Sequence, residues 1–340
     1  MSELKTNKIS TNDQNNVAID NALGLKSYDT AGRDALTSVA GDMIYNTTTS
    51  KVEAYNGSAW EQAGGVDAFS IEYLVIAGGG GGNTNDDTTH GAGGAGGYLC
   101  NVNGENSGGN TSAQPAMFLP KSTNLQVTVG GGGGTNSVGS KSEFTSIMSI
   151  GGGKGAETSN KSGSAGSPNG RTSGGPTAAI TTQIAGQGSQ SGEGVAVHGS
   201  GGAGGAGANG ANGTNGVGGA GGAGLSSSIT GSSVTRGGGG GGGGTTGGAG
   251  GSGGGGAGGS GINSNGTSGT VNTGGGGGGS GNGTGGTPGS GGSGVVILRW
   301  ATADATIGAT RTGLIDGGVQ TDGSDSYIEF TGGEGTISFS

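Results

Sequence analysis

Glycine recurs at every third position through long parts of this chain. The longest uninterrupted run extends from Gly201 to Gly222, and shorter runs cover residues 247–259 and 283–292. A period of three matches neither the turn of an α-helix, about 3.6 residues, nor the two-residue alternation of a strand, but it is the turn of an extended polyproline II helix. We therefore expect residues 199–294 to form extended helices with three residues per turn.

Helices of this kind make no hydrogen bonds within themselves, so buried copies must pair their N–H and C=O groups with neighbours. Glycine removes the side chains that would keep the backbones apart, which predicts a bundle of polyglycine II helices. Ordering the backbone costs about 1–2 kcal/mol per residue, so apolar strands must clamp the bundle. A flexible linker is the alternative interpretation. A collagen triple helix is disfavoured because the chain holds only five prolines.

The composition excludes a conventional apolar core through most of the chain. Of its 340 residues 96 are glycine, and only 28% are hydrophobic. The net charge of −9 argues against nucleic acid as a partner, because such binding needs clustered Lys and Arg. No apolar run approaches the roughly 20 residues of a membrane span, and the first ten residues lack an apolar signal-peptide region. We expect a soluble protein made in the cytoplasm of the host cell.

Short apolar segments supply the expected strands. Residues 69–77 read as a strand that is covered on both faces, and glycines follow it directly. Similar segments occupy residues 125–129, 295–300, 327–330 and 336–339. We predict an all-β fold in which short strands form a sandwich-like or jelly-roll-like base that carries the glycine helices. The predicted domains are an attachment and oligomerisation module at 1–65, the glycine-rich domain at 66–300 and base-completing strands at 301–340.

The N-terminal module differs from the rest of the chain, because few of its first 65 residues are glycine. A short helix is expected near residues 34–39. Residues 43–55 read as a β-hairpin, and the Asn56-Gly57 pair predicts a tight turn that brings Trp60 onto Tyr45 or Tyr55.

Two stretches carry a resemblance to known families. The Ile-Tyr-Asn-Thr-Thr and Tyr-Asn-Gly-Ser-Ala-Trp segments at 44–48 and 55–60 resemble a module of virion fibre proteins from tailed phages that infect marine bacteria. The ordered blocks EYLVIAGGGGG, GAGGAGGY, LQVTVGGGGG and SGVVILRW, within 72–300, resemble the glycine-rich domain of phage tail fibres and polyglycine II receptor-binding adhesins. This resemblance implies a stack of glycine helices whose connecting tips bind a receptor.

Under that resemblance, the receptor surface should lie in the loops that hold the least glycine, since loops on rigid scaffolds concentrate binding residues. The candidate loops are residues 83–90, 156–191 and 225–236. The residues singled out in them are Asn83, Asp86, Asp87, His90, Arg171, Ser228, Thr230 and Arg236. Solvated turns that only join glycine helices are the alternative interpretation. The implied partners are an outer-membrane protein or polysaccharide of the host, other tail or fibre proteins, and further copies of this chain, with a trimer as one form.

Catalytic and metal-binding patterns are not found in the sequence. His90 and His198 lie in unrelated loops and Cys100 is the one cysteine, so no zinc pattern forms and no disulfide can close within the chain. His90 beside Asp86 and Asp87 is read as a solvated turn, not as a metal site. Matches to G-x-G-x-x-G carry no information in so glycine-rich a chain. We predict no cofactor, no metal and no enzymatic activity.

Three functions follow from these observations. The first is a virion tail fibre or distal adhesin that attaches a bacteriophage to its host. The second is a capsid or tail decoration, or a cell-surface filament, without specific recognition. The third is ice binding, which also uses packed polyproline II helices but needs a flat face of regularly spaced Thr or Ala, whereas Thr is irregularly spaced here.

Overall fold

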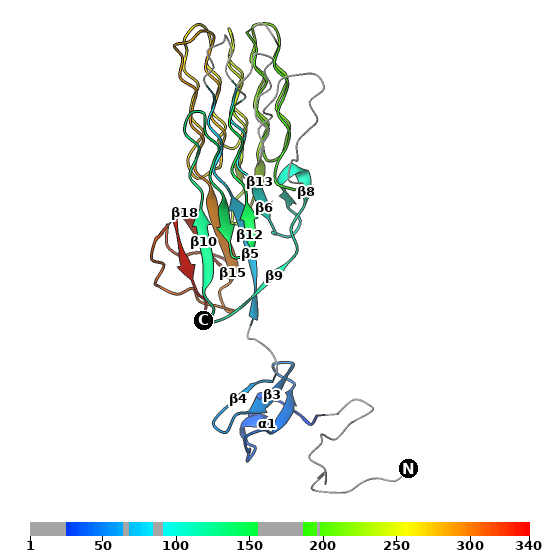
Figure 1. Cartoon of the computed structure of the whole chain (residues 1–340). Helices are drawn as coiled ribbons and strands as arrows, with labels where there is room; N and C mark the ends of the chain where they lie inside the picture. The colour runs from blue at the N-terminus through cyan, green and yellow to red at the C-terminus, as the bar shows by residue number, and fades with distance from the viewer. Residues whose placement is uncertain (1–24, 64–67, 84–90, 156–185, 196–197) are drawn as a thin grey trace, which may run out of the picture. The chain divides into compact units, whose positions relative to one another are not determined.

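A computed structural model describes residues 25–63, 68–83, 91–155, 186–195 and 198–340 (Figure 1). The chain divides into two compact units, Met1–Asp67 and Ala68–Ser340. The regular secondary structure of both units is almost entirely strand. The described residues hold one α-helix, α1 (Thr30–Asp34), and one 3-10 turn, η1 (Gly108–Asn110). The expectation of an all-β fold with little helix is confirmed.

The N-terminal unit is a four-stranded sheet in the order β1-β2-β3-β4, in which β1 runs parallel to β2. Its strands are β1 (Ser27–Tyr28), β2 (Met43–Asn46), β3 (Lys51–Tyr55) and β4 (Trp60–Gln62). The predicted hairpin is confirmed, and the Trp60 ring lies on Tyr55 with the ring centres 5.4 Å apart. The helix predicted near 34–39 was misplaced. It begins earlier because the Asp29 side chain caps it by accepting a hydrogen bond from the Gly32 N–H.

The second unit is built on one ten-stranded sheet with the main order β12-β11-β10-β18-β15-β5-β6. Its path strands are β5 (Ala68–Ile76), β6 (Tyr98–Cys100), β10 (Leu125–Val129), β11 (Ser142–Phe144), β12 (Ile147–Ser149), β15 (Val295–Ala301) and β18 (Asp325–Ile337). Three strands pair off this path: β9 (Met117–Pro120) with β5, and β16 (Leu314–Asp316) and β17 (Gln320–Asp322) with β18. Two small hairpins join β7 (Asn106–Ser107) to β8 (Thr111–Ser112) and β13 (Leu225–Ser227) to β14 (Val234–Arg236).

The sheet is nearly closed on itself, because the end strands β12 and β6 come together. The expected sandwich of two sheets is thus replaced by a single curved sheet. Strand β18 makes the curve possible: it pairs with β15 through Phe330 and with β10 from Gly333 onward. Gly333 has a φ of +91°, a conformation that a side chain would strain. The two C-terminal strands predicted separately at 327–330 and 336–339 are therefore parts of one strand that ends at Ile337.

Apolar side chains cover both faces of the central strands. The inner face of the curved sheet holds the larger cluster, which includes Tyr73, Phe144 and Phe330. The outer face of β5, β6 and β15 packs a second cluster against Ile229, in the loop between β13 and β14. Residues 73–76 are buried on both sides, as their sequence predicts.

Glycine-rich segments continue from the sheet and fold back and forth beyond it (Figure 1). We call residues 77–83, 91–97, 130–141, 150–155, 186–224 and 237–294, as far as they are described, the glycine array. Its segments are neither helix nor strand, apart from isolated bridges. The longest run of phased glycines is divided into short segments. Residues 199–206, 208–214 and 217–224 are three consecutive segments, and each runs antiparallel to the one before it.

The hydrogen bonds of the array repeat every three residues. In segment 77–83, the N–H groups of Gly78 and Gly81 bond to Ser140 and Ser137, those of Gly79 and Gly82 to Gly292 and Gly289, and those of Gly80 and Asn83 to Gly94 and Gly91. Its carbonyl groups accept from three other segments, at 152–155, 133–136 and 277. Successive residues thus point in three directions, and the segment is bonded to neighbours on every side.

Direct backbone contact explains why these positions are glycine. A Cβ atom on Gly79 would lie 2.1 Å from the Gly275 carbonyl oxygen, and one on Gly240 would lie 2.1 Å from the Gly277 oxygen. Buried alanines occur three residues apart, as at Ala203 and Ala206, where the packing accepts a methyl group. At most other positions of the array, glycine is required because a neighbouring backbone leaves no space for a Cβ atom, and not only because of the backbone conformation.

Candidate binding surface

The segments of the array reverse at the end away from the sheet, and these reversals form a row (Figure 1). We call the described reversals at 134–138, 214–217, 244–246, 260–263 and 282–286 the distal turns. Glycine with positive φ makes several of them, with φ of +77° at Gly216, +88° at Gly261 and +89° at Gly283. The opposite, proximal turns lie at 207–208, 252–255 and 270–274.

Four of the distal turns are fastened to one another, and the fifth, at 134–138, is tied to the segment that follows the 282–286 turn, because the Thr135 hydroxyl donates to the Pro288 carbonyl. Val217 forms a bridge to Thr246, Gly244 to Ser260, and Ile262 to Asn282. Side chains add further links: the Asn282 Nδ2 group donates to Thr245 Oγ1 at 2.9 Å, and Asn263 Oδ1 accepts from the Gly285 N–H at 2.8 Å. The turns therefore form a connected surface and not a set of independent loops.

The chemistry of this surface is neutral. None of the residues of the distal turns carries a charged side chain, although the chain as a whole has a net charge of −9. The turns contain threonine, asparagine and serine together with exposed aliphatic residues, of which Ile262 is 79% and Val217 42% exposed. Such a surface can bury apolar side chains and exchange neutral hydrogen bonds with a partner, without long-range electrostatic attraction.

The residues predicted as a site are not brought together by the described structure. Asn83 is buried in the array, where its Nδ2 group donates to the Gly155 carbonyl. Asp86, Asp87, His90 and Arg171 lie outside the described residues.

The predicted loop 225–236 is the β13–β14 hairpin, which lies against the outer face of the sheet. Ile229 is buried in the second apolar cluster, and Arg236 is buried with its guanidinium 3.6 Å from Glu329. Ser228 is exposed but donates both its N–H and its hydroxyl to Glu105, and Thr230 is half-buried. In this structure the hairpin covers the sheet, and Arg236 is not available to a partner.

The resemblance implied connecting tips, but the residues of the distal turns were not identified from the sequence, although a signal for them exists. An isolated apolar residue in a glycine context, such as Val217 or Ile262, cannot lie inside the array, where even a Cβ is excluded at most positions. Such a residue must therefore sit at a reversal. This reasoning also identifies Val271 in a proximal turn.

Other chemical features of the described structure are limited. Burial raises the pKa of the Cys100 thiol to about 12, so the thiol stays protonated near neutral pH. Within the described ranges, no group of three or more His, Cys, Asp or Glu residues is arranged to hold a metal ion. Among the described helices, none is long and apolar enough for a membrane span.

The fold and the surface define a β-protein that carries a hydrogen-bonded glycine array with linked turns at its end. The chain belongs to the glycine-rich domain family, whose model matches residues 48–301. No curated protein and no solved structure matches the chain significantly. The family match stops at the end of β15, so it does not include β18, which joins β10 to β15 in the sheet.

Proposed function

We propose that this chain is a virion surface protein, a tail fibre or distal adhesin that attaches a bacteriophage to its host cell. The distal turns would make the contact, and the receptor would be an outer-membrane protein or polysaccharide. The observation that carries the proposal is a connected, exposed and neutral surface at the end of a scaffold that is made almost entirely of backbone.

We further propose that the array segments are polyglycine II helices. The three-residue repeat of their hydrogen bonds supports this, both in segment 77–83 and in segment 237–244. In the latter, Gly239 and Gly242 bond to Gly222 and Gly219, while Gly238 and Gly241 bond to Gly253 and Gly256. Three residues per turn is the geometry of this helix.

A scaffold of this kind suits a recognition protein for a physical reason. Turns that are already held in place lose little conformational entropy when they bind, so more of the contact energy appears as affinity. The exposed side chains of the distal turns, such as Ile262 and Val217, can differ without disturbing the packing of the array. In this proposal the N-terminal unit docks to other virion proteins, and the chain acts as a homo-oligomer, for which a trimer is one form.

Binding of the labelled full-length chain to cells of candidate hosts tests this function. Ile262→Asp and Val217→Asp place a charge in the contact surface and are expected to reduce binding at least about tenfold, as loss of an interface anchor does. Val271→Asp is the matched control, because the exposure of Val271, 66%, lies between those of Val217 and Ile262, and the residue lies in a proximal turn. It should bind like the parent chain.

Two outcomes would contradict the proposal. If the chain bound no host cell and antibodies located it on the capsid shell, a decoration protein would explain it better. If Val271→Asp and Ile262→Asp reduced binding equally, the distal turns would not be the contact surface. Thermal hysteresis of ice growth would instead favour an ice-binding role.

A further inference from the structure

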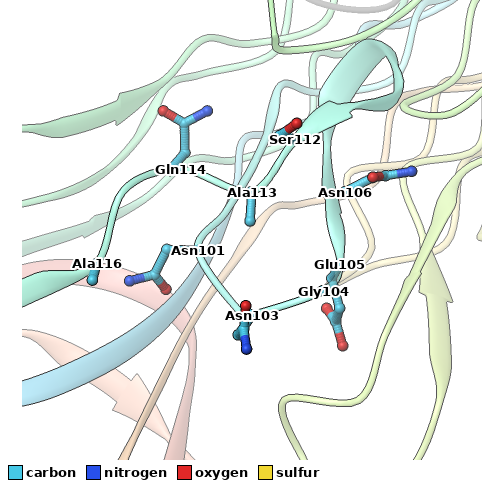
Figure 2. A pocket seen from close by; sticks show the side chains of 9 residues that line it. All are labelled: Asn101, Asn103, Gly104, Glu105, Asn106, Ser112, Ala113, Gln114 and Ala116. Carbon is cyan, nitrogen blue, oxygen red and sulfur yellow. The ribbon is translucent and has the colours of Figure 1, made fainter.

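An open cleft of about 550 Å³ lies beside the outer face of the sheet, far from the distal turns. Two segments line it, residues 101–106 after β6 and residues 112–116 between β8 and β9 (Figure 2). Figure 2 shows the two segments facing each other across the opening, with the Ala113 methyl group pointing into it. This volume falls in the range of ligand sites, roughly 300–1,000 Å³.

The walls of the cleft are fixed by hydrogen bonds. The buried Asn101 side chain accepts from the Tyr73 N–H and donates to the Ile71 carbonyl, which ties the first segment to β5. On the second segment, the Gln114 N–H donates to the Cys100 carbonyl at 2.7 Å. A ligand would therefore meet a preformed cleft.

Polar groups in these walls remain available to a ligand. The side chains of Asn103 and Ser112 are exposed and make no hydrogen bond within the described part of the chain. Glu105 is already engaged, because its Oε1 accepts from Ser228 and its Oε2 accepts from the Cys100 thiol. An amide and a hydroxyl can each donate and accept, as a sugar hydroxyl does.

An exposed aromatic ring stands next to the cleft. Phe118 of β9 is 66% exposed, and it is two residues beyond Ala116, which lines the cleft. Phe118 pairs with Ser70 of β5, and side chains of directly paired residues lie on the same side of a sheet. Ser70 lines a second, smaller cleft of about 220 Å³. The ring therefore lies on the same side of the sheet as Ser70, which lines the smaller cleft.

The charges around the ring select against anionic ligands. The guanidinium of Arg299 in the second cleft is 2.8 Å from Asp325 and 2.9 Å from Asp322, so this cation is already neutralised. Glu72 and Glu105 add further carboxylates beside the two clefts. A ligand that is both polar and uncharged fits this environment best.

We propose that this cleft and Phe118 bind a neutral carbohydrate, with the ring against the apolar face of a sugar and Asn103 and Ser112 on its hydroxyl groups. Aromatic rings provide apolar contact area while amides and hydroxyls fix orientation. This site is separate from the distal turns, so it adds a glycan contact to the chain whatever the distal turns bind.

The test uses the full chain and neutral sugars as probes: glucose, galactose, mannose and N-acetylglucosamine, and oligosaccharides of each, followed by saturation-transfer NMR and titration calorimetry. Saturable binding by at least one of them, at up to millimolar concentrations, is expected. Phe118→Ala and the double variant Asn103→Ala/Ser112→Ala should each weaken it at least about tenfold. Glucuronic acid should not bind.

The controls separate this site from the rest of the molecule. Ile315→Ala removes an exposed apolar side chain, 64% exposed, from β16 and should leave sugar binding unchanged. Ile262→Asp should also leave it unchanged, which distinguishes this inference from the proposed function. The inference is overturned if no neutral sugar binds, or if Phe118→Ala binds as tightly as the parent chain while melting at the same temperature.

Discussion

The β-sheet and the glycine array of the second unit exclude water by different means. In the sheet, Tyr73, Phe144 and Phe330 fill the interior with large side chains. In the array, segments 77–83 and 237–244 are buried along their whole length although glycine supplies almost every residue. The sheet is stabilised by buried apolar area, whereas the array depends on lateral hydrogen bonds and close backbone contact.

This difference predicts opposite responses to mutation. In a core of side chains, removing atoms leaves a cavity, so large-to-small substitutions are the damaging ones. In the array there is nothing to remove, and adding even one methyl group forces backbones apart. The sheet and the array both belong to the second unit, so the free energy of unfolding of that unit reports substitutions in either region.

The largest effect is expected for Phe330→Ala in the sheet. Phe330 is fully buried in the inner cluster, and its truncation should lower the free energy of unfolding by about 3–5 kcal/mol. Denaturant unfolding followed by the fluorescence of Trp300 measures it. A Trp60→Phe background makes Trp300 the one tryptophan, because the chain contains two. A change below 1 kcal/mol would contradict a side-chain-packed sheet.

The next effect is expected for Gly240→Ala in the array. The new Cβ would lie 2.1 Å from the Gly277 oxygen. The backbones of Gly240 and Gly277 are both hydrogen-bonded to other segments, so neither residue can move alone. Overpacking of this kind costs about 1–3 kcal/mol, and the same Trp300 assay measures it. A neutral substitution would mean that the array is loosely packed.

The sheet was partly predictable from the sequence, because its longer strands are apolar segments that either alternate or are apolar on both faces. The alternation of LQVTV gave β10 with the observed ends, Leu125 and Val129. The three-residue strands β6 and β14 adjoin glycines and are too short to show a period, so they were missed. The glycines at 332, 333 and 335 indicated a break, but pairing with β10 and β16 keeps β18 continuous there.

The path of the array could not be predicted, because the glycine phase does not record where a segment reverses. Gly216 and Gly219 share one phase, yet Gly216 sits in a distal turn with positive φ while Gly219 lies inside a segment. Arg236 was predicted as a site residue because it lies in one of the loops that hold the least glycine. The structure instead buries Arg236, and a Cβ on Gly253 would lie 2.9 Å from the carbonyl carbon of Arg236, so glycine there lets another segment pack against the Arg236 backbone.

Acid should affect the sheet region and spare the array. The hydrogen bond from Arg311 lowers the pKa of Asp316 below its ordinary 3.8, although burial opposes this. The ion pair therefore stabilises the fold fully at pH values above 3.8, the ordinary pKa of the aspartate. This contribution is lost as the pH falls through the lowered pKa of Asp316. Hydrogen exchange, corrected for the intrinsic rate at each pH, should accelerate around β16 below about pH 4. Segments 237–244 and 274–282 hold no ionisable side chain and should not respond.

Asp316→Asn provides the control for this pH dependence. It should cost about 1–3 kcal/mol at neutral pH, because the Arg311 and Asp316 side chains are only 17% and 13% exposed, and it should remove the acid response around β16. Segments 237–244 and 274–282 could instead lose protection from hydrogen exchange at the same pH as β16. The sheet and the array would then unfold together, which would contradict the prediction that acid affects them separately.

The smallest effect is expected at a glycine of the array that has room beside it. Gly131 has no atom within 4 Å of its Cβ position, whereas a Cβ on the next residue, Gly132, would lie 2.0 Å from the Gly291 oxygen. Neither residue has a positive φ, so conformation does not separate them. Gly131→Ala should be neutral or stabilise by up to about 1 kcal/mol, through the unfolded state, while Gly132→Ala should destabilise by about 1–3 kcal/mol. If the two alanines changed the free energy of unfolding equally, helical propensity or solvation, and not contact between backbones, would explain why glycine is needed. If the two changes had opposite signs, glycine would be needed because of the limited space between neighbouring segments.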